Sequence, residues 1–193
     1  MQTIAILLLA AGRSSRMRGQ DKLAEQIEGQ PLLTQMCRRA KATGLTVFVT
    51  LPDPAHPRVS LICDATPIWV PDADEGMAAS IRRGVAALPD TVDAVMILPS
   101  DMPELTTQDL LTIAEHHTDN SRTILRATAQ NGTPGHPVLF PRAYFSALQS
   151  LSGDQGARPV LRMGPITPIA LPAQHALTDL DTPEAWDAWR KQR

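Results

Sequence analysis

The stretch IAILLLAAGRSSRMRGQDK, residues 4–22, decides the fold prediction. It begins with an apolar run rich in branched residues, which is typical of a parallel strand buried on both faces. Small residues and Gly12 end the run, so we expect a loop whose backbone can approach a ligand and whose free N–H groups can hold an anion. The loop is surrounded by cations suited to phosphate oxygens, at Arg13, Arg16, Arg18 and Lys22. The stretch therefore predicts a polyphosphate-binding loop at the end of a strand.

The composition is that of an ordinary globular protein, with 193 residues, 43% of them hydrophobic and 20% charged. This length suits one good core and is short for two, so we expect a single domain over residues 1–193. The net charge of -2 argues against nucleic acid or an anionic membrane surface as a partner. The first apolar run is too short to span a membrane and has no basic region before it, so we expect no signal peptide and a cytoplasmic location.

The sequence offers no arrangement typical of a zinc site or of nucleophilic catalysis. The two cysteines, Cys37 and Cys63, do not form a metal-binding pair and have no Cys/His cluster near them in the sequence. We expect both to be reduced, buried thiols. Nothing around His136 resembles a Ser/His/Asp triad.

Apolar runs alternate with helical patterns along the rest of the chain. Strands are expected at residues 45–51, 68–70, 93–98, 122–128, 138–140 and 166–171. Helices are expected at residues 31–44, 76–84, 107–117, 159–163 and 183–190, and the proline-rich residues 52–57 are expected to form a surface loop. This alternation predicts an α/β fold of the three-layer α/β/α sandwich type around a mostly parallel sheet.

Two features lie where such a sheet binds ligands. Asp101 follows the strand at residues 93–98, and ligands of open α/β sheets gather outside the carboxyl ends of strands. Gly76 begins a helix with small residues, and free N–H groups at a helix N-terminus favour a negative ligand. From these residues alone, Asp101 could also be a turn or cap carboxylate, and the helix start could be ordinary.

Together these segments resemble the molybdenum cofactor nucleotidyltransferases, a branch of the sugar-nucleotidyltransferase-like enzymes. The loop at residues 9–17, with Lys22 six residues after Arg16, carries the strongest resemblance. The other matching segments are LPSDMP (98–103), GMAAS (76–80), GHP (135–137) and GDQGAR (153–158), and they follow the family order. The resemblance implies a Rossmann-like fold of the nucleotide-diphospho-sugar transferase type.

The resemblance also implies roles for particular residues. The nucleotide-binding residues would be Leu9, Ala10, Ala11, Gly12, Arg13, Arg16, Lys22, Gly76 and Ser80, and the catalytic residues Arg16, Lys22 and Asp101. Mg²⁺ would be held by Asp101 and Asp181, with Asp179 as the competing carboxylate. The acceptor would be bound by His136, Asp154 and Arg158, although the histidine could simply fix its loop and the other two could form a salt-bridged turn. The basic residues that the family carries before GHP are replaced here by Thr133 and Pro134.

The reaction implied is Mg²⁺-dependent transfer of CMP from CTP to the terminal phosphate of molybdenum-molybdopterin, with release of pyrophosphate. CTP is preferred to GTP because guanylyl-transferring relatives tend to have Gly where this chain has Ala11, whose methyl group would crowd a purine. The expected partners are CTP and a molybdopterin-type cofactor, with an acceptor molybdoenzyme or its chaperone as a further candidate. The alternatives are a guanylyltransferase, a sugar- or polyol-phosphate nucleotidyltransferase and a non-catalytic cofactor carrier; retention of Asp101 and Asp181 disfavours the carrier.

Overall fold

The computed structural model describes residues 3–117 and 122–192, and these form a seven-stranded sheet in the order β5-β4-β1-β6-β8-β7-β9. The strands are β1 (Ile4–Leu9), β4 (Thr46–Leu51), β5 (Thr66–Trp69), β6 (Ala94–Pro99), β7 (Ile124–Thr128), β8 (Pro134–Pro141) and β9 (Ile166–Ala170). Among the described strands of this sheet, β8 alone runs against its neighbours, antiparallel to both β6 and β7. The sheet is therefore mostly parallel, as the sequence predicts.

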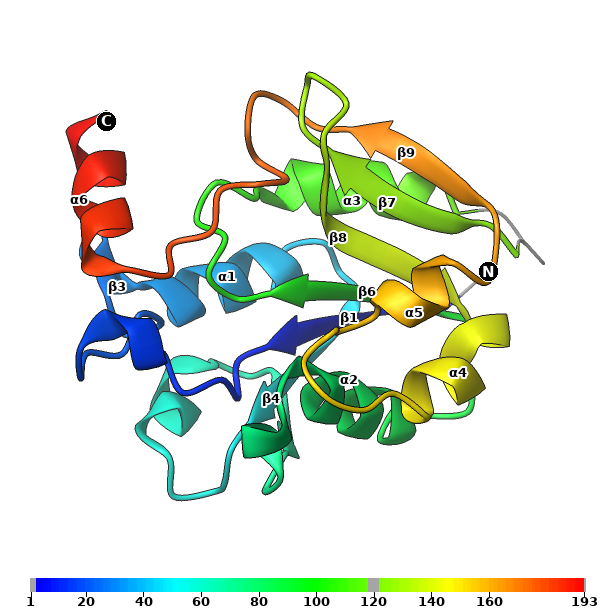
Figure 1. The fold of residues 1–193 in the computed structure, drawn as a ribbon, viewed down its shortest axis with the longest axis horizontal. Helices are drawn as coiled ribbons and strands as arrows, with labels where there is room; N and C mark the ends of the chain where they lie inside the picture. Colours follow the sequence, from blue (N-terminus) through cyan, green and yellow to red (C-terminus); the bar gives the residue numbers. More distant parts are fainter. Residues whose placement is uncertain (1–2, 118–121, 193) are drawn as a thin grey trace.

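Helices cover both faces of the sheet (Figure 1). One layer contains α1 (Leu32–Lys41), α3 (Thr107–Glu115) and α6 (Pro183–Lys191), and the other contains α2 (Met77–Ala86), α4 (Phe145–Gln149) and α5 (Arg158–Leu161). None of the helices in the described ranges is long and apolar enough to cross a lipid bilayer. The three-layer α/β/α sandwich is thus confirmed.

The strand β1 lies at the centre of this arrangement and explains its unbroken apolar run. Ile6 and Leu8 pack into the core on the side of α1, while Ala5 and Leu7 pack into the core on the side of α2. Each large side chain buried in this way stabilises the fold by roughly 1.5–3 kcal/mol. Because β1 pairs with β4 on one side and β6 on the other, the loop that follows it emerges beside the ends of both neighbours.

Short elements connect the layers. They are the 3-10 helices η1 (Ser15–Met17), η2 (Pro57–Leu61), η3 (Ala73–Glu75) and η4 (Arg142–Tyr144), and the antiparallel pair of β2 (Gln26–Ile27) and β3 (Gln30–Pro31). Thr106 forms a capping box with Asp109 at the start of α3, and Thr182 caps α6 with Pro183 behind it.

The structure corrects several local predictions. Cys63 is exposed, because it lies in a turn with a φ of 54°, whereas Cys37 is buried; both are free thiols. The strand expected at 138–140 begins earlier, at Pro134, so β8 includes the GHP segment. The helix α4 and the preceding η4 were not predicted, because their five-residue and three-residue lengths give little periodic signal.

Candidate active site

A cavity of about 650 Å³ opens at the carboxyl ends of β1 and β6. It is lined by all of the residues predicted to bind the nucleotide: Leu9, Ala10, Ala11, Gly12, Arg13, Arg16, Lys22, Gly76 and Ser80. Asp101, which follows β6, lines it as well. This is the position at which open α/β sheets bind their ligands. We refer to it as the nucleotide cavity.

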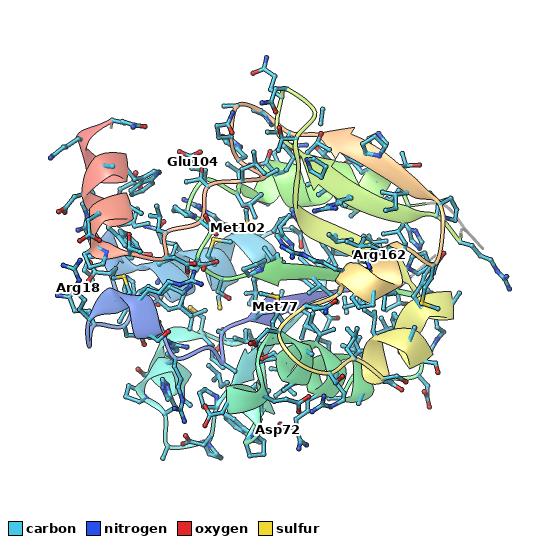
Figure 2. The ribbon with its side chains drawn as sticks, viewed as in Figure 1. Arg18, Asp72, Met77, Met102, Glu104 and Arg162 are labelled. Carbon is cyan, nitrogen blue, oxygen red and sulfur yellow. The ribbon has the colours of Figure 1, made fainter. Side chains whose placement is uncertain are left out.

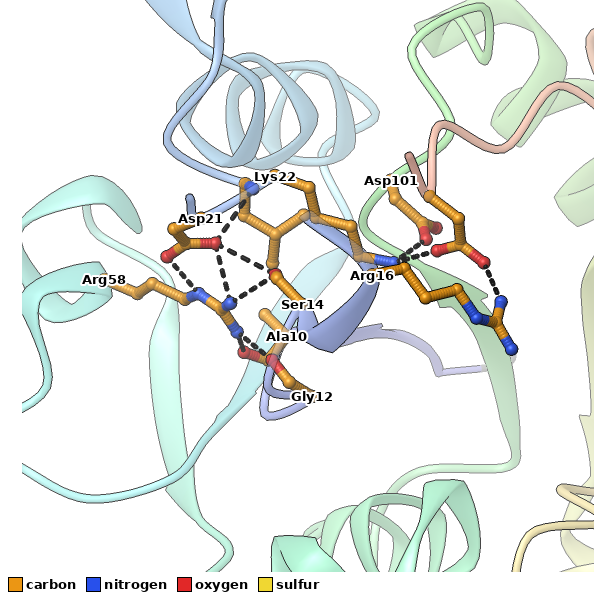
Figure 3. Close-up of polar contacts among 10 residues, drawn as sticks. Ala10, Gly12, Ser14, Arg16, Asp21, Lys22, Arg58 and Asp101 are labelled. Carbon is orange, nitrogen blue, oxygen red and sulfur yellow. Dashed lines mark hydrogen bonds and ion pairs between the residues drawn. The ribbon is translucent and has the colours of Figure 1, made fainter. Parts of the chain in front are cut away.

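A buried arginine fixes the path of the loop after β1 (Figure 3). Arg58 is only 2% exposed, and its Nη1 donates hydrogen bonds to the carbonyl oxygens of Ala10 at 2.5 Å and Gly12 at 2.7 Å. Its Nη2 donates to Ser14 Oγ at 3.0 Å, and its Nε and Nη2 donate to the two oxygens of Asp21 at 2.7 Å each. Burial alone would raise the pKa of Asp21, but Arg58 outweighs it and holds that pKa below its usual value. No local pattern in the sequence predicts a role for Arg58.

The backbone of the loop is left with free donors. The N–H groups of Ala11, Gly12 and Arg13 have no protein acceptor among the residues that the structure describes, whereas Ala10 N donates to Thr50. Consecutive unpaired N–H groups are the basis of an anion-binding concavity. The loop therefore has its carbonyl oxygens engaged by Arg58 and its amide donors available to a ligand.

Two carboxylates and a lysine meet beside the loop (Figure 3). The ammonium group of Lys22 donates to both Asp101 and Asp181, and Arg16 Nη1 donates to Asp181 at 2.7 Å. Burial lowers the pKa of Lys22, but the two carboxylates outweigh it and hold the pKa above its usual value. Burial raises the pKa of Asp181, but the hydrogen bond from Lys22 outweighs it and holds the pKa below its usual value. The structure thus brings together the three residues predicted for catalysis and the second predicted metal ligand.

Asp179, the competing carboxylate, has no hydrogen bond to this lysine. Its pKa is raised by burial and then by the negative charges of Asp101 and Asp181. Asp181 is therefore the carboxylate that shares a cation with Asp101.

The donor set fits a magnesium ion that arrives with a nucleotide. Asp101 and Asp181 both contact the ammonium group of Lys22. In the described part of the chain, Asp101 Oδ1 is buried with no hydrogen-bond partner. Mg²⁺ is usually held by one or two carboxylates together with substrate phosphates. Within residues 3–117 and 122–192 there is no cluster of three or more His, Cys, Asp and Glu side chains that could form an all-protein metal site.

A second cavity, of about 210 Å³, continues from the first. The two share Leu9, Met77 and Asp154, and Figure 2 shows Met77 near the centre of the molecule, at the start of α2. The second cavity has an apolar part, formed by residues that include Ile81, Ile97, Val138 and Phe140, and it contains all three residues predicted to bind the acceptor: His136, Asp154 and Arg158. We refer to it as the acceptor cavity.

His136 is held by its backbone, because its N–H donates to Ala176 O at 2.9 Å. Its ring Nδ1 is buried with no hydrogen-bond partner among the described residues. Burial, followed by the positive charge of Arg126, lowers the pKa of His136 to about 4, so the ring is neutral at neutral pH. Within the described ranges neither ring nitrogen makes a hydrogen bond, so the side chain is not held to its loop in that way.

Asp154 packs against the start of α2. A Cβ atom placed on Gly76 would lie 1.8 Å from Asp154 Oδ1, and Gly76 has a φ of 115°, so this position requires glycine. The N–H of Ala78 donates to Gly153 O at 3.3 Å and holds the turn on the helix. In the described part of the chain no ion pair joins Asp154 to Arg158, so this turn is not salt-bridged.

A mostly parallel sheet with an anion-binding loop and paired carboxylates at its carboxyl edge defines a nucleotide-binding α/β enzyme. Residues 6–174 match the family model described as a MobA-like NTP transferase domain, and the chain belongs to this family. It is therefore a nucleotidyltransferase.

Individual relatives cover nearly the whole chain. It is 27% identical over 201 residues to the purine catabolism protein PucB of Bacillus subtilis (strain 168), covering 96% of this chain and 95% of that protein. It is 27% identical over 197 residues to the molybdenum cofactor guanylyltransferase of Pseudomonas fluorescens (strain SBW25), covering 93% and 90%. The structure of Rv0371c from Mycobacterium tuberculosis in complex with manganese superimposes with a TM-score of 0.83 at 22% identity, covering 100% of both chains. The predicted fold is confirmed by this similarity.

Proposed function

We propose that this nucleotidyltransferase transfers CMP from CTP to the terminal phosphate of molybdenum-molybdopterin, with Mg²⁺ as the metal ion. One observation carries the proposal: the nucleotide cavity, with its loop of free N–H groups and with Asp101 held through Lys22 beside Asp181, continues at Leu9, Met77 and Asp154 into a second cavity that contains cations. Two anionic substrates can therefore meet at a shared boundary. A cytoplasmic location and an acceptor molybdoenzyme or its chaperone as a partner belong to the same proposal.

In this reaction an oxygen of the acceptor phosphate attacks the α-phosphorus of CTP. A new P–O bond forms, the bond between the α-phosphorus and the bridging oxygen breaks, and pyrophosphate leaves with the electron pair. The attacking group is already an anion, so the protein needs no nucleophile of its own and no strong general base. Its task is to align two anions and to stabilise the charge that develops on the leaving oxygen.

The residues of the nucleotide cavity fit this task. The free N–H groups of the loop and the side chains of Arg16 and Lys22 would bind the triphosphate. These two side chains would exchange their carboxylate partners for phosphate oxygens, which would free Asp101 and Asp181 to hold the metal ion. When bound, Mg²⁺ supplies Lewis-acid stabilisation of the phosphate charge.

The choice of nucleotide rests on Ala11, which lines the nucleotide cavity and is buried. A methyl group at this position would crowd a purine more than a pyrimidine. Such a steric difference is worth only about 1–3 kcal/mol, so hydrogen bonds to the cytosine edge must contribute as well. GTP is the second candidate, because one of the relatives described above is named a molybdenum cofactor guanylyltransferase.

The test offers ATP, CTP, GTP and UTP in turn, each with Mg²⁺ and molybdenum-molybdopterin, and follows pyrophosphate release. We expect CTP to give the fastest release. A clear preference for GTP would overturn the cytidylyl assignment, and turnover only with a sugar or polyol phosphate as acceptor would overturn the pterin assignment. No turnover with any of the nucleotides would favour the cofactor carrier.

A further inference from the structure

The acceptor cavity contains an arginine that the sequence analysis did not identify. Arg126 lies on β7 and lines the cavity together with Arg158, the first residue of α5. Its Nε donates to Gly135 O at 3.2 Å, in the backbone of the GHP segment on the neighbouring strand β8. The guanidinium group of Arg126 is thus hydrogen-bonded to the segment that contains His136.

Neither arginine is neutralised by a carboxylate. Among the described residues, no ion pair is formed by Arg126 or Arg158, and the side chain of Arg158 makes no hydrogen bond. Asp154 is the carboxylate that lines this cavity, and it lies beyond ion-pairing distance of both. By contrast, the two arginines that line the nucleotide cavity, Arg13 and Arg16, are each paired with an aspartate.

The two charges act on each other. Burial, and then the positive charge of Arg158, lowers the pKa of Arg126, although a guanidinium group remains protonated at any physiological pH. Two uncompensated cations at one partly buried wall repel each other, and an anion bound between them would replace this repulsion with attraction. The cavity is therefore prepared for a negatively charged group.

The anion that fits best carries two charges on one compact centre. Arg suits bidentate contacts to phosphate oxygens, and a phosphomonoester dianion offers enough oxygens for two such contacts. The neutral ring of His136 and the apolar side chains of Ile81, Val138 and Phe140 suit an uncharged cyclic body attached to that phosphate.

We propose that Arg126 and Arg158 together form the subsite that binds the phosphomonoester of the acceptor, before it attacks the nucleotide. The residues just before the GHP segment, Thr133 and Pro134, are uncharged. Arg126, on the neighbouring strand β7, provides a positive charge beside that segment instead. This inference rests on the proposed function for the identity of the acceptor, but the class of ligand follows from the charges of the cavity alone. The two arginines bind the attacking phosphate, and their positive charges reduce the electrostatic repulsion between this phosphate and the triphosphate.

The test is a calorimetric titration of the whole chain with phenyl phosphate, in the absence of nucleotide. Benzoate is the matched probe, because it has the same ring with a singly charged carboxylate. We expect phenyl phosphate to bind the wild-type protein at least tenfold more tightly than benzoate. We expect Arg126→Gln and Arg158→Gln each to weaken phenyl phosphate binding at least tenfold.

The control variant is Arg162→Gln, which removes an exposed arginine one turn after Arg158 (Figure 2) and should change binding less than twofold. A second variant, Arg16→Gln, reports on binding in the nucleotide cavity. Equal binding of both probes, or loss of phenyl phosphate binding only in Arg16→Gln, would overturn the proposed subsite. Because the side chain of Arg158 makes no hydrogen bond or ion pair in the described part of the chain, Arg158→Gln should fold even if Arg126→Gln does not.

The two proposals can fail separately. If phenyl phosphate binds as expected but molybdenum-molybdopterin supports no pyrophosphate release, the function is wrong and the subsite stands. If the cofactor is turned over normally and the arginine variants bind phenyl phosphate like the wild type, the subsite is wrong and the function stands.

Discussion

The nucleotide cavity and the acceptor cavity use the same kind of side chain in opposite ways. In the nucleotide cavity every cationic side chain is already neutralised, because Arg13, Arg16 and Lys22 each contact an aspartate. In the acceptor cavity Arg126 and Arg158 have no such partner within the described ranges. A ligand of the first cavity would therefore have to replace existing ion pairs, whereas the second cavity presents cations that are already unpaired.

The largest effect should come from the buried arginine that holds the nucleotide loop. Arg58→Met would leave Asp21 and two loop carbonyl groups without their partner, Ala10 O in a buried setting and the others in a partly buried one, so we expect the free energy of unfolding to fall by about 3–5 kcal/mol. Urea unfolding measures this change. The control is Arg83→Met, which removes an exposed pair with Asp72 and should change stability by about 0–1 kcal/mol. Equal effects of the two variants would contradict the idea that the loop is fixed from its carbonyl side.

The next largest effect, on the rate of the reaction, should come from replacing the carboxylates Asp101 and Asp181. Asp101→Asn should slow pyrophosphate release about 10²–10³-fold, since a metal ion stabilises the transition state by several kcal/mol. Asp181→Asn should be milder, because an amide oxygen can still coordinate. The matched control is Asp179→Asn, two residues away, and the readout is the rate as a function of Mg²⁺ concentration. If Asp179→Asn were as damaging as Asp101→Asn, the metal-site assignment would fail.

The pH dependence of stability sharpens the acceptor side of the comparison. The pKa of His136 is about 4 in the folded protein, against 6.5 for an exposed histidine, because of burial and then Arg126. The unfolded chain therefore takes up the proton first. The contribution of the neutral His136 ring to the free energy of unfolding, roughly 3 kcal/mol, is fully present above pH 6.5. It is lost as the pH falls towards 4.

Urea unfolding between pH 7 and pH 4 tests this expectation. His136→Gln should flatten the profile, because it removes the buried imidazole. A profile that is the same in wild type and His136→Gln would show that burial and Arg126 do not lower the pKa of this ring.

A smaller effect should separate two neighbouring arginines of the nucleotide loop. Arg16 lines the cavity and pairs with Asp181, while Arg18 is equally exposed and pairs with Glu184 outside the cavity. Arg16→Ala should raise the KM for CTP about tenfold, as expected for the loss of one charged hydrogen bond, with little change in stability. Arg18→Ala should change neither quantity, and a similar rise in KM for both variants would indicate a general charge effect.

The parts of this account that were predictable from sequence depend on local patterns. The apolar run before Gly12 predicted the central strand and the loop, and the position of Asp101 after β6 predicted the edge of the sheet at which the site lies. The resemblance added Asp181 and the acceptor residues. The acceptor residues line the acceptor cavity, and Asp181 pairs with Lys22, which lines the nucleotide cavity.

The parts that were missed depend on contacts between distant residues. Arg58 follows a proline-rich loop and binds Asp21, 37 residues earlier, so no local spacing marks it as a buried residue. Arg126 is one polar residue within a strand, and its relation to Gly135 exists only because β7 and β8 are paired. The bridging of Asp101 and Asp181 by Lys22 likewise requires the folded chain.

In the proposed function, the two adjoining cavities bind the two substrates separately. The most direct measurement is the steady-state KM for CTP and for molybdenum-molybdopterin in Lys22→Gln and Arg126→Gln, following pyrophosphate release. The account predicts that Lys22→Gln raises the KM for CTP alone and Arg126→Gln raises the KM for the acceptor alone, each about tenfold or more for a lost charged contact. If both variants raised the KM of the same substrate, the two cavities would not be separate sites and the account would be contradicted.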